Sequence, residues 1–176
     1  MIVVLLLAIA LVISGCTSAV NLPPPTSSGV VLSIGSPAPE ATFTTIEGKE
    51  VTLSEYRGEK VMFWFLATWC PSCTSAAKSL ERNNDQLNGM KVIALKTYGN
   101  AGYKGSSIGA FAQRYAPNTL HYDNWNWGDA SPQATSDYNF MNYPDIYFLI
   151  DENGILQGVD GAPAATLNKI IVFARG

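Results

Sequence analysis

The chain has 176 residues, of which 47% are hydrophobic and 14% are charged. This length and composition suit one globular domain with a sizeable core. The formal net charge of −3 excludes the broadly basic surface that nucleic-acid binding needs, so we expect no nucleic-acid partner.

The N-terminal segment is typical of a targeting signal. Residues 2–13 are almost unbroken aliphatic, which is short for a bilayer span but matches the apolar part of a signal peptide. The stretch Ile13-Ser14-Gly15-Cys16 resembles the bacterial lipobox, although no Lys or Arg precedes it. That resemblance implies a signal peptide over residues 1–15, cut before a lipidated Cys16. An uncleaved apolar anchor is the alternative, and both interpretations place the domain outside the cytoplasm at a membrane.

Residues 16–33 predict a linker that begins at the lipidated cysteine. Its middle part is rich in Pro and Ser and carries no charge. The consecutive prolines Pro23, Pro24 and Pro25 favour an extended, semi-rigid chain of about 3 Å per residue. We therefore expect a spacer between the membrane and a folded domain over residues 34–176.

The first part of that domain predicts strands and one helix. The apolar alternation around Phe43 and the stretch 51–53 indicate two short strands, with Ser54 capping the turn that follows. The apolar run 61–67 indicates a fully buried strand. The next segment has helical spacing, and its apolar face consists of Cys73, Ala76, Ala77, Leu80 and Leu87.

The middle of the domain is predicted to alternate between strands and helices. Residues 91–95 predict a third buried strand, and residues 106–115 a helix. Residues 120–123 predict a short strand, and residues 131–138 a short helix. Between those two, residues 124–129 predict an aromatic loop, which either covers the local core or forms a rim that contacts a partner.

The last part predicts a hairpin and a helix. A strand over residues 145–150 begins directly after a proline, which is tolerated at the first position of a strand. Residues 151–154 form a turn and residues 155–159 the return strand. A final helix is predicted over residues 163–174.

The sequence Trp69-Cys70-Pro71-Ser72-Cys73 lies where the buried strand 61–67 meets the first helix. Pro71 suits the first helical position, because its missing N–H and fixed φ cost nothing there. Cys70 then occupies the N-cap, where the positive end of the helix dipole favours thiolate over thiol. Cys73 lies almost one turn further on. The pattern predicts an exposed attacking Cys70 and a resolving Cys73 that form a reversible, redox-active disulfide, with no organic cofactor.

Three other uses of the cysteine pair fit less well. A structural zinc site needs four ligands, whereas the chain has three Cys and one His, and Cys16 is far away. A c-type haem site needs His where Thr74 stands. A purely structural disulfide across so short a loop constrains little chain entropy. We therefore expect redox chemistry and no metal.

The stretch GSPAPEATFTTIEGKEVTLSEYRGEKVMFWFLATWCPSC resembles the start of a TlpA/ResA-type thioredoxin-like domain of the broader redoxin group. The resemblance runs from about Gly35 to the C-terminus. It implies an α/β thioredoxin fold, with a central mixed sheet flanked by helices and an N-terminal β extension. The stretch YPDIYFLIDENG resembles the cis-proline strand of that family, which implies a cis Tyr143–Pro144 bond beside the thiols.

The resemblance also implies a substrate groove. Its expected residues are Trp69 and Pro71, which flank Cys70 in the sequence, and Tyr143 and Pro144, which shape the groove. The backbone of Tyr143 is expected to pair with an extended substrate peptide.

Two departures from the family bear on the proton of Cys73. Some ResA-like reductases carry Glu where this chain has Ala76, and thioredoxin carries a buried Asp where this chain has Trp64. Water, or Asp145 directly after the proline, is therefore the expected proton relay.

These features together predict a membrane-tethered, extracytoplasmic thiol–disulfide oxidoreductase. Its partners would be protein thiols and disulfides, and a membrane electron donor. We expect a reductase, because Pro71 and Ser72 carry no charge and a negative Asp145 near the sulfurs would oppose the thiolate.

Two other classes remain open. A thiol peroxidase of the redoxin group is one, but its Pro-x-x-x-Thr-x-x-Cys pattern is not met, since Phe63 and Ala67 stand at the first two positions. A copper-binding chaperone of similar fold is the other. That class uses Cys-x-x-x-Cys with a His, whereas His121, the sole histidine, falls in the predicted strand 120–123.

Overall fold

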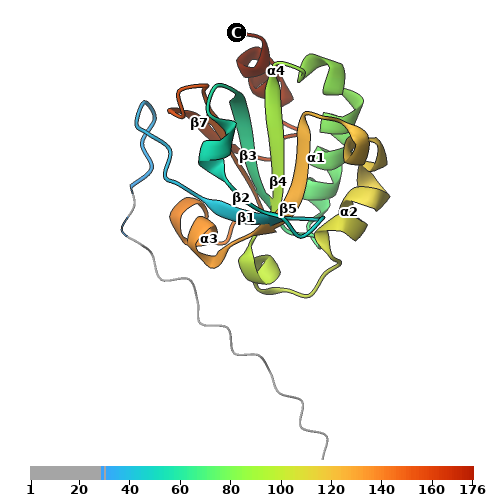
Figure 1. The fold of residues 1–176 in the computed structure, drawn as a ribbon. Helices are drawn as coiled ribbons and strands as arrows, with labels where there is room; N and C mark the ends of the chain where they lie inside the picture. Colours follow the sequence, from blue (N-terminus) through green and yellow to red (C-terminus); the bar gives the residue numbers. More distant parts are fainter. Residues whose placement is uncertain (1–28, 30) are drawn as a thin grey trace, which may run out of the picture.

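The computed structural model describes Gly29 and residues 31–176 of the chain. In this part of the chain a seven-stranded sheet has the strand order β2-β1-β5-β4-β3-β6-β7 (Figure 1). The strands are β1 (Thr42–Thr45), β2 (Glu50–Thr52), β3 (Lys60–Leu66), β4 (Met90–Lys96), β5 (Trp125–Ala130), β6 (Asp145–Ile150) and β7 (Leu156–Gly161). The helices are α1 (Pro71–Arg82), α2 (Ile108–Tyr115), α3 (Pro132–Tyr138) and α4 (Leu167–Arg175), and the short 3-10 turns are η1 (Leu53–Tyr56), η2 (Asn84–Gln86), η3 (Tyr98–Gly102) and η4 (Pro117–His121).

The sheet is mixed, as expected. Strands β3, β4 and β5 are parallel, whereas β6 is antiparallel to β3 and β7 is antiparallel to β6. The β1–β2 hairpin adds to the outer edge of β5 and forms the predicted N-terminal extension. The carboxyl ends of β3 and β4 therefore lie at one edge of the sheet, where loops can build a site.

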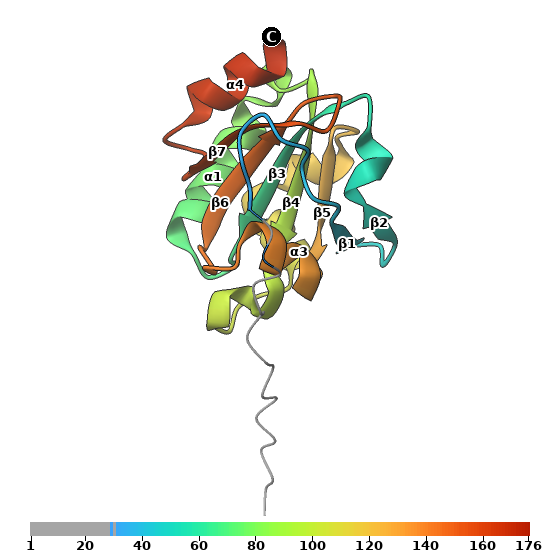
Figure 2. The ribbon, with the colours of Figure 1, turned by 90° about the vertical axis from the view of Figure 1, so that its left-hand side faces the viewer.

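The core consists of two apolar clusters, one on each face of the sheet. Residues of β3 alternate between them: Met62, Trp64 and Leu66 face the first cluster, and their neighbours Phe63 and Phe65 face the second. Helices α1, α2 and α4 contribute to the first cluster and α3 to the second. Figures 1 and 2 show α3 on the opposite side of the sheet from α1 and α2. Because β3 is buried on both faces, its sequence is a continuous apolar run.

Most predicted elements occur within a few residues of their expected bounds, but residues 120–129 do not. The expected strand at 120–123 is replaced by the end of η4, which places His121 in a 3-10 turn. The expected aromatic loop is strand β5, which pairs with β4 and β1. Polar residues make this stretch look like a loop, yet Trp125 and Trp127 alternate inward and are 6% and 3% exposed. The tryptophans thus belong to the core, which agrees with the first of the two alternatives, and the alternative of a partner-binding rim is wrong.

Smaller differences occur at the ends of elements. Thr52, and not Ser54, is the N-cap of η1, where it forms a capping box with Glu55. The final helix begins at Leu167, later than expected. The signal peptide, Cys16 and almost all of the linker lie outside the described residues. Within the described part, no helix is long and apolar enough to cross a membrane.

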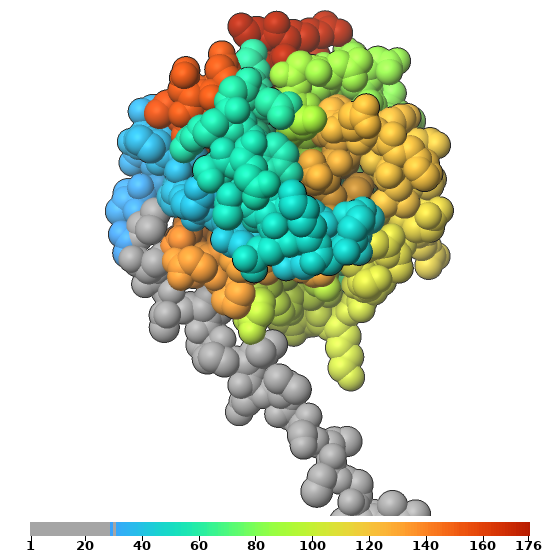
Figure 3. Space-filling model, viewed as in Figure 1, coloured from blue at the N-terminus to red at the C-terminus, as the bar shows by residue number. Residues whose placement is uncertain are grey.

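The face shown in Figure 3 has a hollow beside the β1–β2 hairpin. It is a cavity of about 430 Å³. Ion pairs Lys49–Glu55 and Lys91–Glu59 line it, each with an N–O distance of 3.4 Å. The hollow lies near the amino ends of β3 and β4, at the opposite end of the sheet from the cysteine pair.

Candidate active site

Strand β3 brings Cys70 to the start of α1. After the strand the chain turns, and the Cys70 N–H donates to the carbonyl of Ala67 at 3.1 Å. Cys70 has extended backbone angles, φ −83° and ψ 124°, and is the N-cap residue, followed by Pro71 inside the helix. The strand–cysteine–helix junction is therefore the predicted one, and the Cys70 side chain lies by the unpaired N–H groups of the first helical turn.

Both cysteines of the motif are free thiols with different partners. The Sγ of Cys70 lies 3.0 Å from the hydroxyl of Ser72. The Sγ of Cys73 donates to the carbonyl of Pro144 at 2.6 Å. Cys73 is fully buried, and Cys70 is only 4% exposed, so the expectation of an exposed Cys70 is wrong. Cys70 packs into the first core cluster, and only a small part of it is open to an incoming disulfide.

Asp145 joins the two cysteines, as expected. The two sulfurs and a carboxylate oxygen of Asp145 all lie within 4.8 Å of one another. The Trp64 indole N–H donates to Asp145 Oδ1 at 2.9 Å. This contact follows from the β3–β6 register, because Asp145 pairs with Leu66 and so lies diagonally across from Trp64 on the same face. Asp145 Oδ2 is buried without a well-aligned hydrogen-bond partner among the described residues.

The site disfavours negative charge on Cys73 and on Asp145. Burial raises the pKa of the Cys73 thiol, and the neighbouring Asp145 charge raises it further. Burial also raises the pKa of the Asp145 carboxyl, and contacts with Ser72, Trp64 and Cys73 oppose this only in part. The dithiol form therefore keeps Cys73 protonated beside a carboxyl group that accepts a proton more readily than an exposed one.

Pro144 contacts the thiols, but its peptide bond differs from the expectation. The described residues contain no cis peptide bond, so the Tyr143–Pro144 bond is trans. The chain reverses instead at Asn142, whose φ is 54°, and this turn brings the Pro144 carbonyl to Cys73 without a cis bond. The same carbonyl also accepts the Ala67 N–H at 2.9 Å.

The Tyr143 backbone is occupied in this structure. Its N–H donates to Asn139 Oδ1, and its carbonyl accepts from Asn139 Nδ2, both at 2.8 Å. The expectation that this backbone is free to pair with a substrate peptide is therefore wrong. The Tyr143 side chain is exposed and, with Pro144, lines a cavity of about 420 Å³ next to Ser72.

Trp69 lies on the other side of the thiols. Its indole N–H donates to the carbonyl of Asn100 at 2.8 Å. Its ring contacts the Tyr103 ring edge-on, with centroids 4.9 Å apart. Both side chains are exposed, Trp69 to 39%, so they form an aromatic surface beside Cys70.

Among the described residues, Cys70, Cys73 and Asp145 form a group whose ligand atoms suit a metal ion. This set has three members, one fewer than a structural zinc site uses. His121 does not belong to it.

Sequence reasoning missed three features that build the site: Asn100, Asn139 and the pairing of Trp64 with Asp145. Asn139 lies four residues before Tyr143, a spacing that could have suggested a local hydrogen bond. Asn100 follows a glycine in a polar stretch, a weak turn signal. The contact between Trp64 and Asp145 had no signal in the sequence, because it depends on the register of β3 and β6.

Comparisons with known proteins agree with this geometry. Residues 34–159 match the AhpC/TSA family. The chain is 27% identical to the thioredoxin-like protein YneN of Bacillus subtilis, covering 71% of this chain and 69% of YneN. It is 30% identical to the thiol-disulfide oxidoreductase ResA of Geobacillus kaustophilus (70% and 66%) and 33% identical to the chloroplastic peroxiredoxin Q of Gentiana triflora (78% and 65%). The chain therefore spans about two thirds of the length of these relatives.

The fold also matches solved structures. A thioredoxin-like protein from Aeropyrum pernix superposes with a TM-score of 0.59, at 22% identity, over 74% of this chain and 87% of that one. This likeness confirms the predicted thioredoxin fold.

Proposed function

The chain belongs to the AhpC/TSA family, and from this premise we propose that it is a thiol–disulfide oxidoreductase that reduces protein disulfides at a membrane surface outside the cytoplasm. The enzyme class follows from the family and from two neighbouring free thiols at the start of α1. One observation carries the proposal. The two thiols have unequal surroundings: Cys70 lies at the helix end, whereas Cys73 is buried against the Pro144 carbonyl and Asp145.

The unequal surroundings support an order of reaction. The Cys70 thiolate attacks one sulfur of the substrate disulfide, whose S–S bond breaks and releases one substrate thiol after protonation. Cys73 then gives its proton to the Asp145 carboxylate and attacks Cys70 Sγ. This second step releases the other substrate thiol and leaves a Cys70–Cys73 disulfide. Two electrons pass to the substrate, and a dithiol donor in the membrane restores the enzyme by the reverse exchange.

Asp145 suits the role of proton acceptor for Cys73. Its Oδ2 lies buried without a well-aligned partner, while Oδ1 is held by Trp64. Burial raises the pKa of this carboxyl, which brings its proton affinity closer to that of a thiol.

The substrate side of the proposal rests on the surface around the thiols. Trp69 and Tyr143 are exposed on either side of the pair, and Pro71 follows Cys70 at the start of α1. The cavity lined by Tyr143 and Pro144 opens next to Ser72. An extended segment flanking a substrate cysteine could lie along this surface and bring its disulfide to Cys70.

The reducing direction is supported by the charges near the thiols. A cysteine pair becomes a strong oxidant when its thiolate is strongly stabilised. Here burial and Asp145 raise the pKa of Cys73, which opposes a second thiolate. We expect a potential nearer to about −270 mV than to about −120 mV. Equilibration with glutathione and dithiothreitol measures it, and a value above about −180 mV would favour an oxidase or isomerase instead.

The location is proposed from the N-terminal sequence. The apolar residues 2–13 and the lipobox-like stretch ending at Cys16 support export and lipidation, and the proline-rich linker supports a spacer above the membrane.

Insulin reduction tests the central proposal. Cys70→Ser should abolish activity because the attacking thiolate is lost. Cys73→Ala should instead retain attack but accumulate mixed disulfides, which non-reducing gels and mass spectrometry detect. Full activity of Cys70→Ser would remove Cys70 from the mechanism.

Peroxide reduction is the second candidate function, and the similarity to peroxiredoxin Q favours it. Against it, Phe63 and Ala67 stand where the peroxidase pattern has Pro and Thr, and Phe63 is buried in β3. Hydrogen peroxide consumption coupled to a dithiol donor separates the two functions. Fast, Cys70-dependent consumption together with slow insulin reduction would favour the peroxidase.

A further inference from the structure

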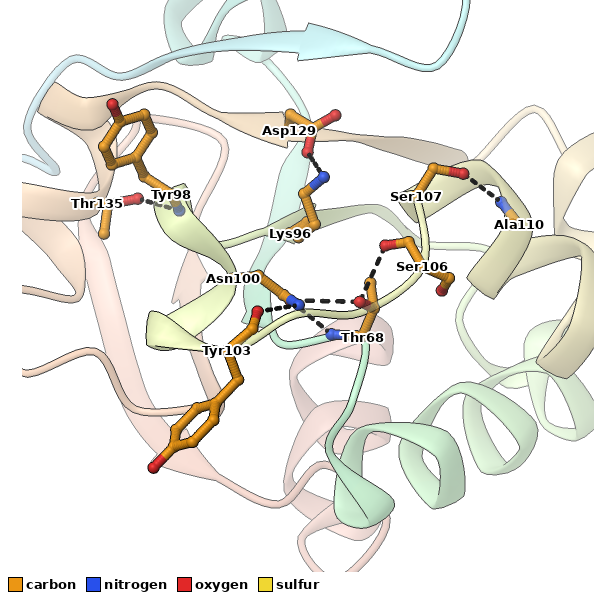
Figure 4. A network of polar contacts seen from close by, with 10 residues as sticks. All are labelled: Thr68, Lys96, Tyr98, Asn100, Tyr103, Ser106, Ser107, Ala110, Asp129 and Thr135. Carbon is orange, nitrogen blue, oxygen red and sulfur yellow. Dashed lines mark hydrogen bonds and ion pairs between the residues drawn. The ribbon is translucent and has the colours of Figure 1, made fainter. Parts of the chain in front are cut away.

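A buried asparagine holds the turn that immediately precedes Cys70. Asn100 Oδ1 accepts the backbone N–H of Thr68 at 2.9 Å, and Asn100 Nδ2 donates to the Tyr103 carbonyl at 2.9 Å (Figure 4). The Asn100 carbonyl accepts the indole N–H of Trp69. Asn100 thus binds Thr68 and Trp69, two of the three residues that connect β3 to the thiol pair.

The backbone around Asn100 is shaped for this contact. Gly99, Asn100 and Ala101 lie consecutively in the left-handed region, with φ of 65°, 53° and 54°. Asparagine tolerates this region better than most residues, whereas alanine does not. Such strain persists only where the surroundings impose it, and it clusters at functional sites. Gly105 packs so closely that a Cβ there would lie 2.5 Å from Asn100 Nδ2 and 2.3 Å from Thr68 Oγ1.

A second buried asparagine holds the loop on the other side of the thiols. Asn139 is 1% exposed, and its amide group binds both the N–H and the carbonyl of Tyr143, directly before Pro144. Its Nδ2 also lies 3.3 Å from Thr97 Oγ1. Thr97 is fully buried, and its N–H donates to the carbonyl of Leu66 at the end of β3. The carbonyl of Thr97 accepts the N–H of Asn100 at 2.8 Å. The two asparagines are therefore linked through one residue.

We propose that Asn100 and Asn139 are positioning residues that hold the two loops on either side of the thiols in a fixed relation. Asn100 fixes the turn that sets the direction of Cys70, and Asn139 fixes the loop whose Pro144 carbonyl and Asp145 carboxyl face Cys73. The inference rests on the proposed role of Cys70 as the attacking thiol and extends it, because it assigns the reactivity of Cys70 to a network outside the cysteine motif.

The hydrogen bonds of this network are directed at the residues that flank the site. Without the Asn100 side chain, the buried Thr68 N–H loses its acceptor and the turn must shift to satisfy it. Since Cys70 follows two residues later, its sulfur then moves relative to the helix end and Asp145. A displacement of about 1 Å at a reacting group can lower a rate by about a hundredfold.

The test compares two variants at Asn100. Asn100→Gly removes the side chain but accepts the positive φ, whereas Asn100→Asp keeps an acceptor for the Thr68 N–H. The readouts are the pH profile of Cys70 alkylation by iodoacetamide and the equilibrium constant of the Cys70–Cys73 disulfide with glutathione. We expect Asn100→Gly to lower the alkylation rate or shift the equilibrium by about tenfold, and Asn100→Asp to stay within about threefold of the wild type.

Asn84 provides the control. It is buried at the other end of the sheet, where its Oδ1 accepts the Trp125 indole N–H at 2.7 Å. Asn84→Gly should lower the thermal midpoint without changing either readout. If Asn100→Gly likewise lowers only the midpoint, Asn100 is merely structural and the inference is wrong.

A second variant decides the matter if Asn100→Gly does not fold. Gly105→Ala places a methyl group against the ends of the Thr68 and Asn100 side chains, which can give way, so the fold should survive. It should shift the same two readouts, and unchanged values would overturn the inference. Failure of the proposed function is distinguishable, because it appears as insulin reduction that survives in Cys70→Ser.

Discussion

Two neighbouring thiols differ in their surroundings at the level of single residues. Cys73 is enclosed, and burial and Asp145 raise its pKa. Cys70 lies at the helix end with a small exposed surface. The proposed difference between an attacking and a resolving thiol therefore rests on burial and one carboxyl group, in a motif whose other residues carry no charge.

Alkylation should reveal this difference. At neutral pH, iodoacetamide should modify the folded, reduced domain once, at Cys70, because only thiolates react and the Cys73 thiolate is disfavoured. In denaturant both cysteines of the motif should react. Intact mass and peptide mapping give the stoichiometry and the position. A first adduct on Cys73 would reverse the assigned roles.

Asp145 should also shape the dependence of stability on pH. Burial raises its folded pKa above the ordinary value of 3.8, so the folded state binds this proton more tightly than the unfolded state. Stability from this group is therefore highest below the ordinary pKa and declines as the pH rises through the folded pKa. Asp145→Asn cannot ionise and should lose this decline, so its stability relative to the wild type should grow from acid to neutral pH. Urea unfolding of the reduced protein over this range measures it.

Asp160 should change stability with pH in the opposite direction to Asp145. A hydrogen bond from Lys169 lowers the pKa of Asp160, so the stability from this ion pair is present above the ordinary pKa and lost as the pH falls. Asp160→Asn should therefore cost stability at neutral pH and little at acid pH. If the stability of both variants changed with pH in the same direction, burial would not disfavour the charged form of Asp145.

At the level of elements, strand β5 connects the core of the sheet to the N-terminal extension. It pairs with β4 on one side and with β1 on the other. Its Trp125 and Trp127 rings stack with centroids 5.4 Å apart and fill the first core cluster. Asn84 and Thr119 accept their indole N–H groups, so the polar ends of the two rings are satisfied inside the core.

The contact between β5 and β1 allows no side chain at Gly128. A Cβ there would lie 2.4 Å from the Thr44 carbonyl oxygen. Gly128→Ala should therefore destabilise the protein by about 1–3 kcal/mol and loosen β1. Urea unfolding measures the loss, and hydrogen exchange at β1 should locate it.

Gly109→Ala is the control variant for Gly128→Ala. A Cβ at Gly109, in the first turn of α2, meets only Ile46, at an ordinary 3.7 Å. Because alanine favours helix, this variant should be neutral or more stable by roughly 0.5 kcal/mol. Equal losses for both variants would show that close strand packing is not the cause at Gly128.

At the level of the whole molecule, the thiols lie at the carboxyl end of the parallel strands, and the charged hollow lies at the other end. The first described residues lead to the same region as the thiol loops, since Leu32 lines a cavity with Asn139 and Tyr143. A membrane anchor attached to the residues before Leu32 would therefore join the domain near its thiols.

The anchor itself is testable by intact mass. The lipobox-like stretch predicts that the membrane-extracted protein begins at a lipid-modified Cys16. Two or more acyl chains are expected, because one chain binds a membrane only marginally. Cys16→Ser should lose both the cleavage and the lipid mass. A wild-type chain with an unmodified Cys16, or one that retains Met1, would contradict lipidation.

The sequence alone determined the features that depend on neighbours along the chain. The apolar run of β3, the Pro71 start of α1 and the position of Cys70 at the helix end are local, and each follows from periodicity or capping. Asp145 was placed near the thiols by the resemblance of its strand to a known family, and the structure puts it there.

Only the tertiary structure decided the features that depend on contacts between distant segments. Polar residues concealed strand β5, because its hydrogen bonds come from β4 and β1. The trans Tyr143–Pro144 bond follows a turn at Asn142, in a loop that hydrogen-bonds to the side chain of Asn139. The contacts of Asn100 with Thr68 and of Trp64 with Asp145 join residues 32 and 81 positions apart. Such pairs depend on how distant segments are placed by the sheet, so no local pattern in the sequence encodes them.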